Sequence, residues 1–139
     1  MLVRLLYVSR AVEPLDAKTL DAILEESRNY NQVHGITGAL CSYEAGNVFL
    51  QVIEGGRDEV NRLYNKIVGD PRHTDVVLLD YTEIDERRFA NWRMGRVDLQ
   101  RVNPSTILRY SEHPVLDPFS MTAKSALALL EELIAILPG

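Results

Sequence analysis

Short apolar runs alternate with longer amphipathic segments along most of this chain. In the first run, residues 2–9, Val3, Leu5 and Tyr7 fall on one side of an extended backbone. Leu6 and Val8 fall on the other side, because successive strand side chains point to opposite faces. Both sides are apolar, so we expect a β-strand that is covered on both faces.

The stretch 35–55 predicts a β-hairpin. Two runs rich in apolar and β-branched residues, 35–43 and 48–55, flank a turn at 44–47 that contains glycine and asparagine. Within the second run, Phe49, Gln51 and Ile53 share one face, while Leu50 and Val52 share the other. A buried polar group without a partner costs about 1–3 kcal/mol. Gln51 therefore requires polar partners inside the core.

Two amphipathic segments predict helices. The first begins at Asp16 as N-cap, extends to about residue 31 and stops before Gly35. Its apolar positions are Leu20, Ile23 and Leu24, and the same stripe continued by helical spacing reaches Ser27 and Asn31. The face directed at the core thus becomes polar in its last turns. The second helix is expected over residues 57–68, between a glycine pair and an Asp-Pro step.

A fourth strand is expected over residues 76–81 and a fifth that begins near Trp92 or Met94. The resulting order predicts an α+β fold, a ferredoxin-like βαββαββ sheet of five strands with two helices on one face. A short helix at 104–110 and a longer one capped by Ser120 would cover the other face. We therefore expect a domain at residues 1–98 and a C-terminal helical extension at 99–139. The apolar stripe of the longer helix consists of Ala126, Leu127, Leu130, Leu133, Ile134 and Leu137.

Charge and composition narrow the class of protein. The 139 residues carry a formal net charge of −5 with a pI of about 5.2, which argues against nucleic acid as a partner. Cys41 is the single cysteine, so an intrachain disulfide and a cysteine-rich metal site are excluded. The apolar runs are too short to span a bilayer and no signal peptide is evident. We expect a cytoplasmic protein that does not enter membranes.

Three polar residues stand out in the predicted core: Tyr7, Gln51 and Asn31. If the first and third strands are neighbours, Tyr7 and Gln51 can meet on the face that carries the first two helices. A phenol and two amides around an apolar space suit a flat heteroaromatic ligand with imide-like edges. The same residues would also suit a small hydrogen-bond network that only stabilises the fold. Residue types alone leave both interpretations open.

A polar cluster follows the second predicted helix: Lys66, Asp70, Arg72 and His73. It could hold the polar or phosphate tail of a ligand, or it could be a solvated helix end with cations near the negative end of the dipole. No second histidine, cysteine or carboxylate stands at ligand spacing from His73, so no metal site is expected.

Several ordered motifs together resemble the BLUF domain, a blue-light sensor that uses FAD. The resemblance extends over about residues 2–97, and the tail is similar to that of short stand-alone BLUF photoreceptors. The matching residues are Tyr7, Ser27-Arg28-x-x-Asn31, Gly35-Ile36-Thr37-Gly38, Phe49-Leu50-Gln51-Val52-Ile53-Glu54-Gly55, Asp70-Pro71-Arg72-His73 and Phe89-x-x-Trp92-x-Met94.

The resemblance implies a photoreceptor rather than an enzyme, with FAD, or alternatively FMN, bound non-covalently between the two helices. It implies that Asn31 bonds the ring's carbonyl and imide edge and that Gln51 lies between Tyr7 and the flavin. The other cofactor contacts that it implies are Ser27, Ile23, Ile36, Phe49, Lys66, Asp70 and His73.

The resemblance also implies a mechanism. Light would drive electron and proton transfer from Tyr7, and the hydrogen bonds of Gln51 would switch. The signal would leave through Trp92 and Met94 towards the tail, and then to a partner protein. A response-regulator-like partner and a homo-oligomer are the assemblies that it suggests.

Two other functions are compatible with a ferredoxin-like sheet. An acylphosphatase-like hydrolase would use an arginine after the first strand, and Arg10 stands there, but no glycine-rich phosphate cradle surrounds it. An RNA-binding sheet with exposed aromatic residues is opposed by the acidic charge and by strands that are apolar on both faces.

Overall fold

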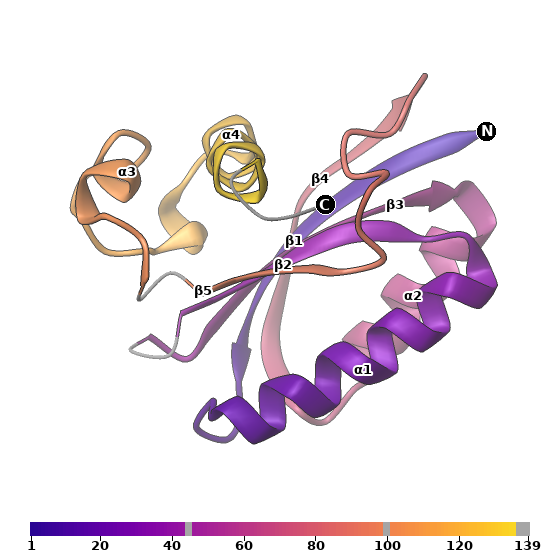
Figure 1. Ribbon diagram of the computed structural model, residues 1–139, viewed down its shortest axis with the longest axis horizontal. Helices are drawn as coiled ribbons and strands as arrows, with labels where there is room; N and C mark the ends of the chain where they lie inside the picture. The colour runs from indigo at the N-terminus through magenta and orange to yellow at the C-terminus, as the bar shows by residue number, and fades with distance from the viewer. Residues whose placement is uncertain (44–45, 99–100, 136–139) are drawn as a thin grey trace.

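The computed structural model describes residues 1–43, 46–98 and 101–135. The order of the elements confirms the predicted βαββαββ arrangement followed by C-terminal helices (Figure 1). The elements are β1 (Leu2–Ala11), α1 (Ala17–His34), β2 (Thr37–Tyr43), β3 (Val48–Gly56), α2 (Arg57–Val68), β4 (His73–Ile84), β5 (Gly95–Asp98), α3 (Pro104–Leu108), the 3-10 turn η3 (Pro118–Ser120) and α4 (Ala123–Ile134).

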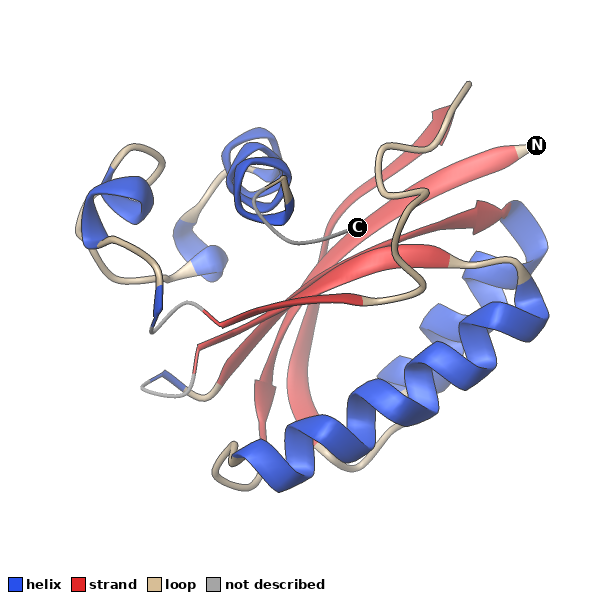
Figure 2. Ribbon diagram, in the orientation of Figure 1, coloured by secondary structure: helices blue, strands red, loops and turns tan. Residues whose placement is uncertain are grey.

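The five strands form one sheet in the order β4-β1-β3-β2-β5. All neighbouring pairs are antiparallel except β2 and β5, which are parallel. Helices α1 and α2 cover one face, and α3 and α4 lie on the opposite side (Figures 1 and 2). The sheet is therefore the middle layer, as the two apolar faces of its strands require.

Two apolar clusters, one on each face of the sheet, follow the predicted alternation. Tyr7 and Phe49 belong to the cluster under α1 and α2. Val8 and Leu50 belong to the cluster under α4, where Leu129 and Leu130 are fully buried. The central strands β1 and β3 thus bury side chains in both layers.

The ends of the two long helices follow from local chemistry. The Asp16 side chain accepts a hydrogen bond from the Thr19 backbone N–H at 2.7 Å and caps α1. Gly35 ends the same helix in the left-handed conformation, with φ 67°, which glycine adopts at little cost. Helix α1 continues to His34, three residues beyond the expected end, and α2 has the bounds that the flanking glycine and proline signals predict.

The expected fourth strand was too short, whereas the expected start of the fifth strand near Met94 is confirmed. Strand β4 is longer than residues 76–81 because its polar ends still pair with β1, His73 with Ala11 and Ile84 with Leu2. Strand β5 begins at Gly95, the residue directly after Met94. Pairing with a neighbour, rather than apolar character, determines these bounds.

The C-terminal helix also begins later than expected. Ser120 ends the η3 turn, whereas Thr122 caps α4 by accepting a hydrogen bond from the Ser125 N–H at 3.0 Å. Of the predicted stripe, Leu127 is only partly buried, and Leu129 takes a fully buried place instead. Leu137 lies outside the described residues.

A buried ion pair fastens the segment after β4 to the sheet. Glu54 is completely buried and pairs with Arg4 at 2.9 Å. The same carboxylate accepts hydrogen bonds from the backbone N–H groups of Arg88 at 3.0 Å and Phe89 at 2.8 Å. One side chain therefore serves β1, β3 and the loop that leads to β5.

Replacing Glu54 by alanine should lower the free energy of unfolding by about 3–5 kcal/mol, because Arg4 would remain buried without its counter-ion. The Glu83→Ala variant is the matched control, since Glu83 pairs with Arg57 at the surface. That change should cost about 1 kcal/mol or less. Urea unfolding measures both, and equal effects would contradict the structural role given to Glu54.

Among the described residues, no helix is both long and apolar enough to cross a membrane.

Candidate functional site

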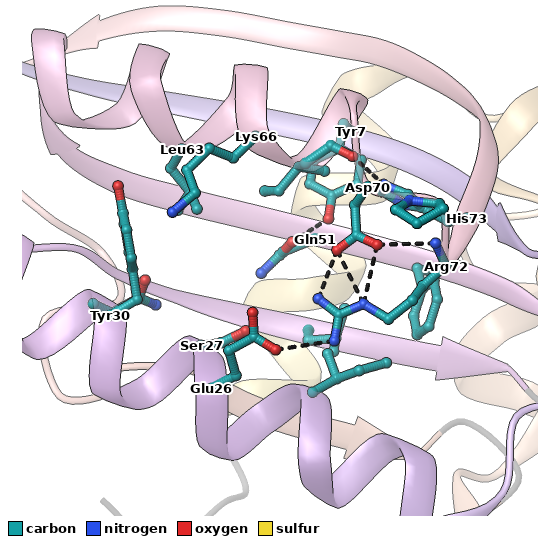
Figure 3. A pocket seen from close by; sticks show the side chains of 16 residues that line it. Tyr7, Glu26, Ser27, Tyr30, Gln51, Leu63, Lys66, Asp70, Arg72 and His73 are labelled. Atoms are coloured by element: carbon teal, nitrogen blue, oxygen red, sulfur yellow. Dashed lines mark hydrogen bonds and ion pairs between the residues drawn. The ribbon is translucent and has the colours of Figure 1, made fainter.

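A cavity of about 590 Å³ opens between α1, α2 and the sheet (Figure 3). Its volume lies in the range of pockets that hold cofactors and drug-sized ligands. Leu40 and Phe49 provide an apolar surface from the sheet, and Leu63 and Ile67 provide one from α2. The wall of the cavity is therefore mostly apolar and contains a few polar side chains.

The polar centre of the cavity is the Tyr7–Gln51 pair. These residues face each other directly in the antiparallel ladder of β1 and β3, which confirms that the first and third strands are neighbours. The Tyr7 hydroxyl donates a hydrogen bond to Gln51 Oε1 (Figure 3). On its other end, Gln51 Nε2 donates to the Met94 sulfur at 3.3 Å. The amide thus connects a phenol to the segment just before β5.

The environment keeps Tyr7 protonated. Tyr7 is 4% exposed, and burial raises the pKa of its phenol far above the ordinary value, with the neighbouring Tyr64 and Asp70 adding to the effect. The Tyr64 ring lies 5.9 Å from that of Tyr7, and the His73 ring lies 6.3 Å away, edge-on. At neutral pH the phenol therefore holds a proton that it can donate to Gln51.

This raised pKa predicts a loss of stability at alkaline pH. Above pH about 10 the unfolded chain ionises its tyrosines while Tyr7 stays neutral in the folded state, so the unfolded state binds fewer protons. The stabilisation from Tyr7 should be complete below that pH and fall by about 1.4 kcal/mol per pH unit above it. Urea unfolding from pH 9 to 11 tests this, and Tyr7→Phe should reduce the slope. An unchanged slope would contradict it.

Asn31 presents an unanswered acceptor at the wall of the cavity. The residue is 1% exposed, and its Nδ2 donates to the backbone carbonyl of Arg93. Its Oδ1 is buried and has no hydrogen-bond partner within the described part of the chain. Such an atom costs about 1–3 kcal/mol unless a ligand or water supplies a donor. An acceptor beside an apolar slot suits the N–H of an imide edge, so the residues present fit a flavin ring.

Charged side chains lie at one end of the cavity. Arg72 bonds Asp70 at 2.6 Å and Glu26 at 3.0 Å and so joins α1 to the start of β4 (Figure 3). The Arg72 guanidinium lowers the pKa of Asp70 and keeps that carboxylate ionised. Lys66 lies across the gap between the helices, with its ammonium 4.5 Å from the centre of the Tyr30 ring. Lys66 can therefore meet an anionic tail at this rim, whereas the charge of Arg72 is already paired with two carboxylates.

His73 is less available than the sequence suggested. Its Nδ1 lies 2.9 Å from Ser9 Oγ, and its Nε2 contacts the Ile67 carbonyl. Both ring nitrogens are therefore engaged by the protein. Its ring lines the cavity, but its role there is that of a wall.

The structure brings together nine of the ten cofactor-contact residues that the resemblance implied. Ile36 is the exception: it is buried in the same apolar cluster but does not line the cavity. The nine are Tyr7, Ile23, Ser27, Asn31, Phe49, Gln51, Lys66, Asp70 and His73.

Seven further residues line the cavity beyond the implied cofactor contacts, and one of them, Arg72, belongs to the polar cluster already considered for a ligand's tail. Glu26 and Tyr30 stand at helical spacing from Ile23, so periodicity could have found them. Arg72 bonds Glu26, which lies 46 residues away in the sequence, and Asp70, which lies two residues before it. The remaining additions are Leu40, Leu63, Ile67 and Pro71.

Trp92 and Met94 lie on opposite sides of the sheet. Met94 is 2% exposed and belongs to the cluster that contains Tyr7. Trp92 is partly buried and packs against the cluster under α4. Of these two residues, Met94 is the one that accepts a hydrogen bond from Gln51.

The features of a hydrolase do not assemble here. Arg10 pairs with Asp75 at 3.6 Å and lies 4.2 Å from the Phe119 ring, within the layer that carries α4. It does not line the cavity. Among the residues that the structure describes, no group of histidine, cysteine, aspartate and glutamate side chains could hold a metal ion.

Comparisons with known proteins identify the family of this chain. The family described as BLUF, sensors of blue light using FAD, matches residues 2–95. The β subunit of a photoactivated adenylate cyclase from Euglena longa is 40% identical over 94 residues, which is 67% of this chain. The chain spans 11% of the length of that relative, so the match concerns one segment of a much longer protein.

Solved structures extend the match to the tail. The photo-activated state of BlsA is 33% identical, with a TM-score of 0.86, and the alignment covers 100% of this chain and 99% of that one. The dark-state structure of BlrB, a BLUF protein, is 31% identical with a TM-score of 0.78 and covers 96% and 95%. With the family match over more than half of its residues, this chain belongs to the BLUF family of blue-light sensors that use FAD.

Proposed function

We propose that this blue-light photoreceptor holds its flavin in the cavity between α1 and α2 and reads light through the Tyr7–Gln51 pair. The main support is the buried hydrogen bond from the Tyr7 hydroxyl to Gln51. It links a proton donor to an amide that can exchange its donor and acceptor ends, within a cavity large enough for a cofactor. The cyclase relatives match only in a short segment of their length. We therefore assign no cyclase activity to these residues.

The chain's own groups suit a light-driven switch. When bound, the flavin supplies the absorption of blue light and, once excited, a strong one-electron oxidant. Loss of an electron makes the Tyr7 phenol strongly acidic, and its proton passes to Gln51 Oε1 along the hydrogen bond that already exists. Return of the electron and the proton restores tyrosine. The amide is left rotated if Oε1 gives back the proton it received, or as its tautomer if Oε1 keeps that proton and Nε2 gives up one of its own. No covalent bond to the flavin forms and no substrate is consumed.

Gln51 is suited to this role because an amide can exchange its donor and acceptor ends with little change in volume. In the arrangement seen here, its acceptor meets Tyr7 and its donor meets Met94. After rotation the Met94 sulfur would face an oxygen and lose its donor. The change at the chromophore is thereby converted into altered packing just before β5.

We assign the cofactor contacts as follows. Asn31 Oδ1 accepts from the imide edge of the ring, and Ile23, Ser27 and Phe49 line its slot. Lys66 offers positive charge to the phosphates. FAD is the family's cofactor, and FMN is present in a solved structure of BlrP1 from Klebsiella pneumoniae that is 36% identical.

We assign residues 1–98 to the flavin-binding domain and residues 99–139 to an extension that receives the signal. The packing of α4 against β5 and β2 supports this division. The output would pass to a response-regulator-like partner or another protein, from a homo-oligomer. The free, buried Cys41 is compatible with a reducing, cytoplasmic setting.

The proposal is tested by expressing the protein in flavin-sufficient cells. It should be purified as a yellow protein, and acid precipitation should release the flavin for identification as FAD or FMN. Blue light should shift the flavin absorption to longer wavelength, with full return in darkness. A colourless protein that also fails to bind added FAD would contradict the proposal.

A further inference from the structure

Three consecutive backbone carbonyls, those of Trp92, Arg93 and Met94, are held by donors from α1 and β2. The Gly38 N–H donates to the Trp92 carbonyl at 3.0 Å. Asn31 Nδ2 donates to the Arg93 carbonyl. Arg28 Nε donates to the Met94 carbonyl at 3.1 Å. The segment 92–94 is therefore fixed by these donors at the point where it leads into β5.

This arrangement places both ends of Met94 under restraint. Its carbonyl is bonded to Arg28, and its sulfur accepts from Gln51 Nε2 at 3.3 Å. The side chain is 2% exposed, so it has little freedom of its own. A change in Gln51 can consequently move the backbone of residues 92–94 only against the restraint from α1.

Arg28 supplies a strong hydrogen bond in this group. A guanidinium N–H bonded to a carbonyl is charge-assisted, and such bonds exceed neutral ones in strength. The donor comes from α1, whose neighbouring turn contributes Asn31 and Ser27 to the cavity wall. One helix therefore bounds the chromophore cavity and holds the segment that carries Met94.

We propose that Arg28 is a positioning residue that holds the Met94 carbonyl, so that rearrangement of Gln51 is transmitted to β5 and α4 instead of being absorbed by a loose segment. The inference rests on the proposed function and adds a residue that does not line the cavity. Beyond Met94, the path continues at Gly95, where an added Cβ would lie 2.5 Å from Ile134 of α4. Little slack exists between this point and the C-terminal helix.

The test compares backbone hydrogen exchange of residues 92–98 in the flavin-loaded full chain, in darkness and under blue light. In Arg28→Ala, exchange in darkness should rise by about threefold or more, as expected for loss of a charge-assisted bond. The light-dependent difference in exchange should largely disappear. The red shift of the flavin should persist, because Tyr7 and Gln51 are untouched.

Arg87→Ala is the matched control. Arg87 also donates to a backbone carbonyl, that of Gly35 at 2.7 Å, and it joins the same loop to the end of α1. Its other described hydrogen bond goes to the Thr37 hydroxyl at 3.1 Å, and none of those described goes to residues 92–94. Its loss should therefore leave the exchange of residues 92–98 and its light dependence as in the wild type. Arg28→Lys keeps the charge without the fixed Nε–H and should restore part of the protection.

Wild-type exchange in Arg28→Ala would overturn the proposal, and so would an equal rise in Arg28→Ala and Arg87→Ala. If Arg28→Ala does not fold, Arg28→Lys against Arg87→Lys decides, and equal exchange in those two overturns it. A wild-type protein without any red shift would instead contradict the proposed function. The two failures are therefore distinguishable.

Discussion

Replacing Gln51 by alanine should abolish the light-induced red shift while the protein still binds flavin. The amide bonds both the Tyr7 hydroxyl and the Met94 sulfur. Without it, the phenolic proton has no acceptor in its present position and no donor–acceptor pair can exchange. Absorption spectra before and after blue light measure the effect.

The cavity walls from α1 and α2 remain in Gln51→Ala, so loss of the shift would not reflect loss of the site. Stability should fall by about 1–3 kcal/mol, because the buried Tyr7 hydroxyl loses its partner. Gln32→Ala is the matched control, as Gln32 is an exposed glutamine on α1 that bonds only the Arg93 side chain at 2.8 Å among the contacts described. A full red shift in Gln51→Ala would remove the amide from the mechanism.

Gly38→Ala should prevent stable folding. A Cβ at this position would lie 2.0 Å from the Val52 backbone oxygen, a distance that no real contact permits. The obstacle is backbone of the central strand β3, which cannot move without breaking the pairing of Gly38 with Ile53. The N–H of Gly38 also holds the Trp92 carbonyl, so any displacement would loosen the segment before β5.

Gly56→Ala serves as the control for Gly38→Ala, because an added Cβ at Gly56 meets nothing within 4 Å and the backbone there has φ −62°. We expect Gly38→Ala to lose more than about 3 kcal/mol of unfolding free energy or to yield insoluble protein. The Gly56 variant should stay within about 1 kcal/mol of the wild type. Thermal unfolding followed by circular dichroism separates them. A native-like Gly38 variant would show that β2 and β3 can separate locally.

Local chemistry explains what could be predicted from the sequence. The alternation of strand side chains places Tyr7 and Gln51 on the same face, and the order of the elements makes their strands neighbours. The pair could therefore be expected from the sequence alone. Helix ends were predictable where the sequence contains a capping residue or a helix-breaking residue, as at Asp16, Gly35 and the start of α2.

Partner-dependent features could not be predicted. The polar ends of β4 are extended because they pair with β1, and the local sequence does not show that pairing. Donors from α1 and β2 hold the three carbonyls just before β5, including the bond from Arg28 to Met94, and nothing in the local sequence indicates these long-range bonds. Arg72 bridges 46 residues to Glu26, and only the folded chain brings the two together.

The three-layer arrangement places the cavity and the segment that we propose as the output on opposite sides of the sheet. The cavity opens among the helices of one layer, whereas the tail occupies the other, and the sheet stands between them as a partition (Figure 2). Changes to the outer surface of the tail can therefore accumulate without disturbing the photochemistry. A domain of this kind can evolve contacts with new partner proteins while its light response stays unchanged.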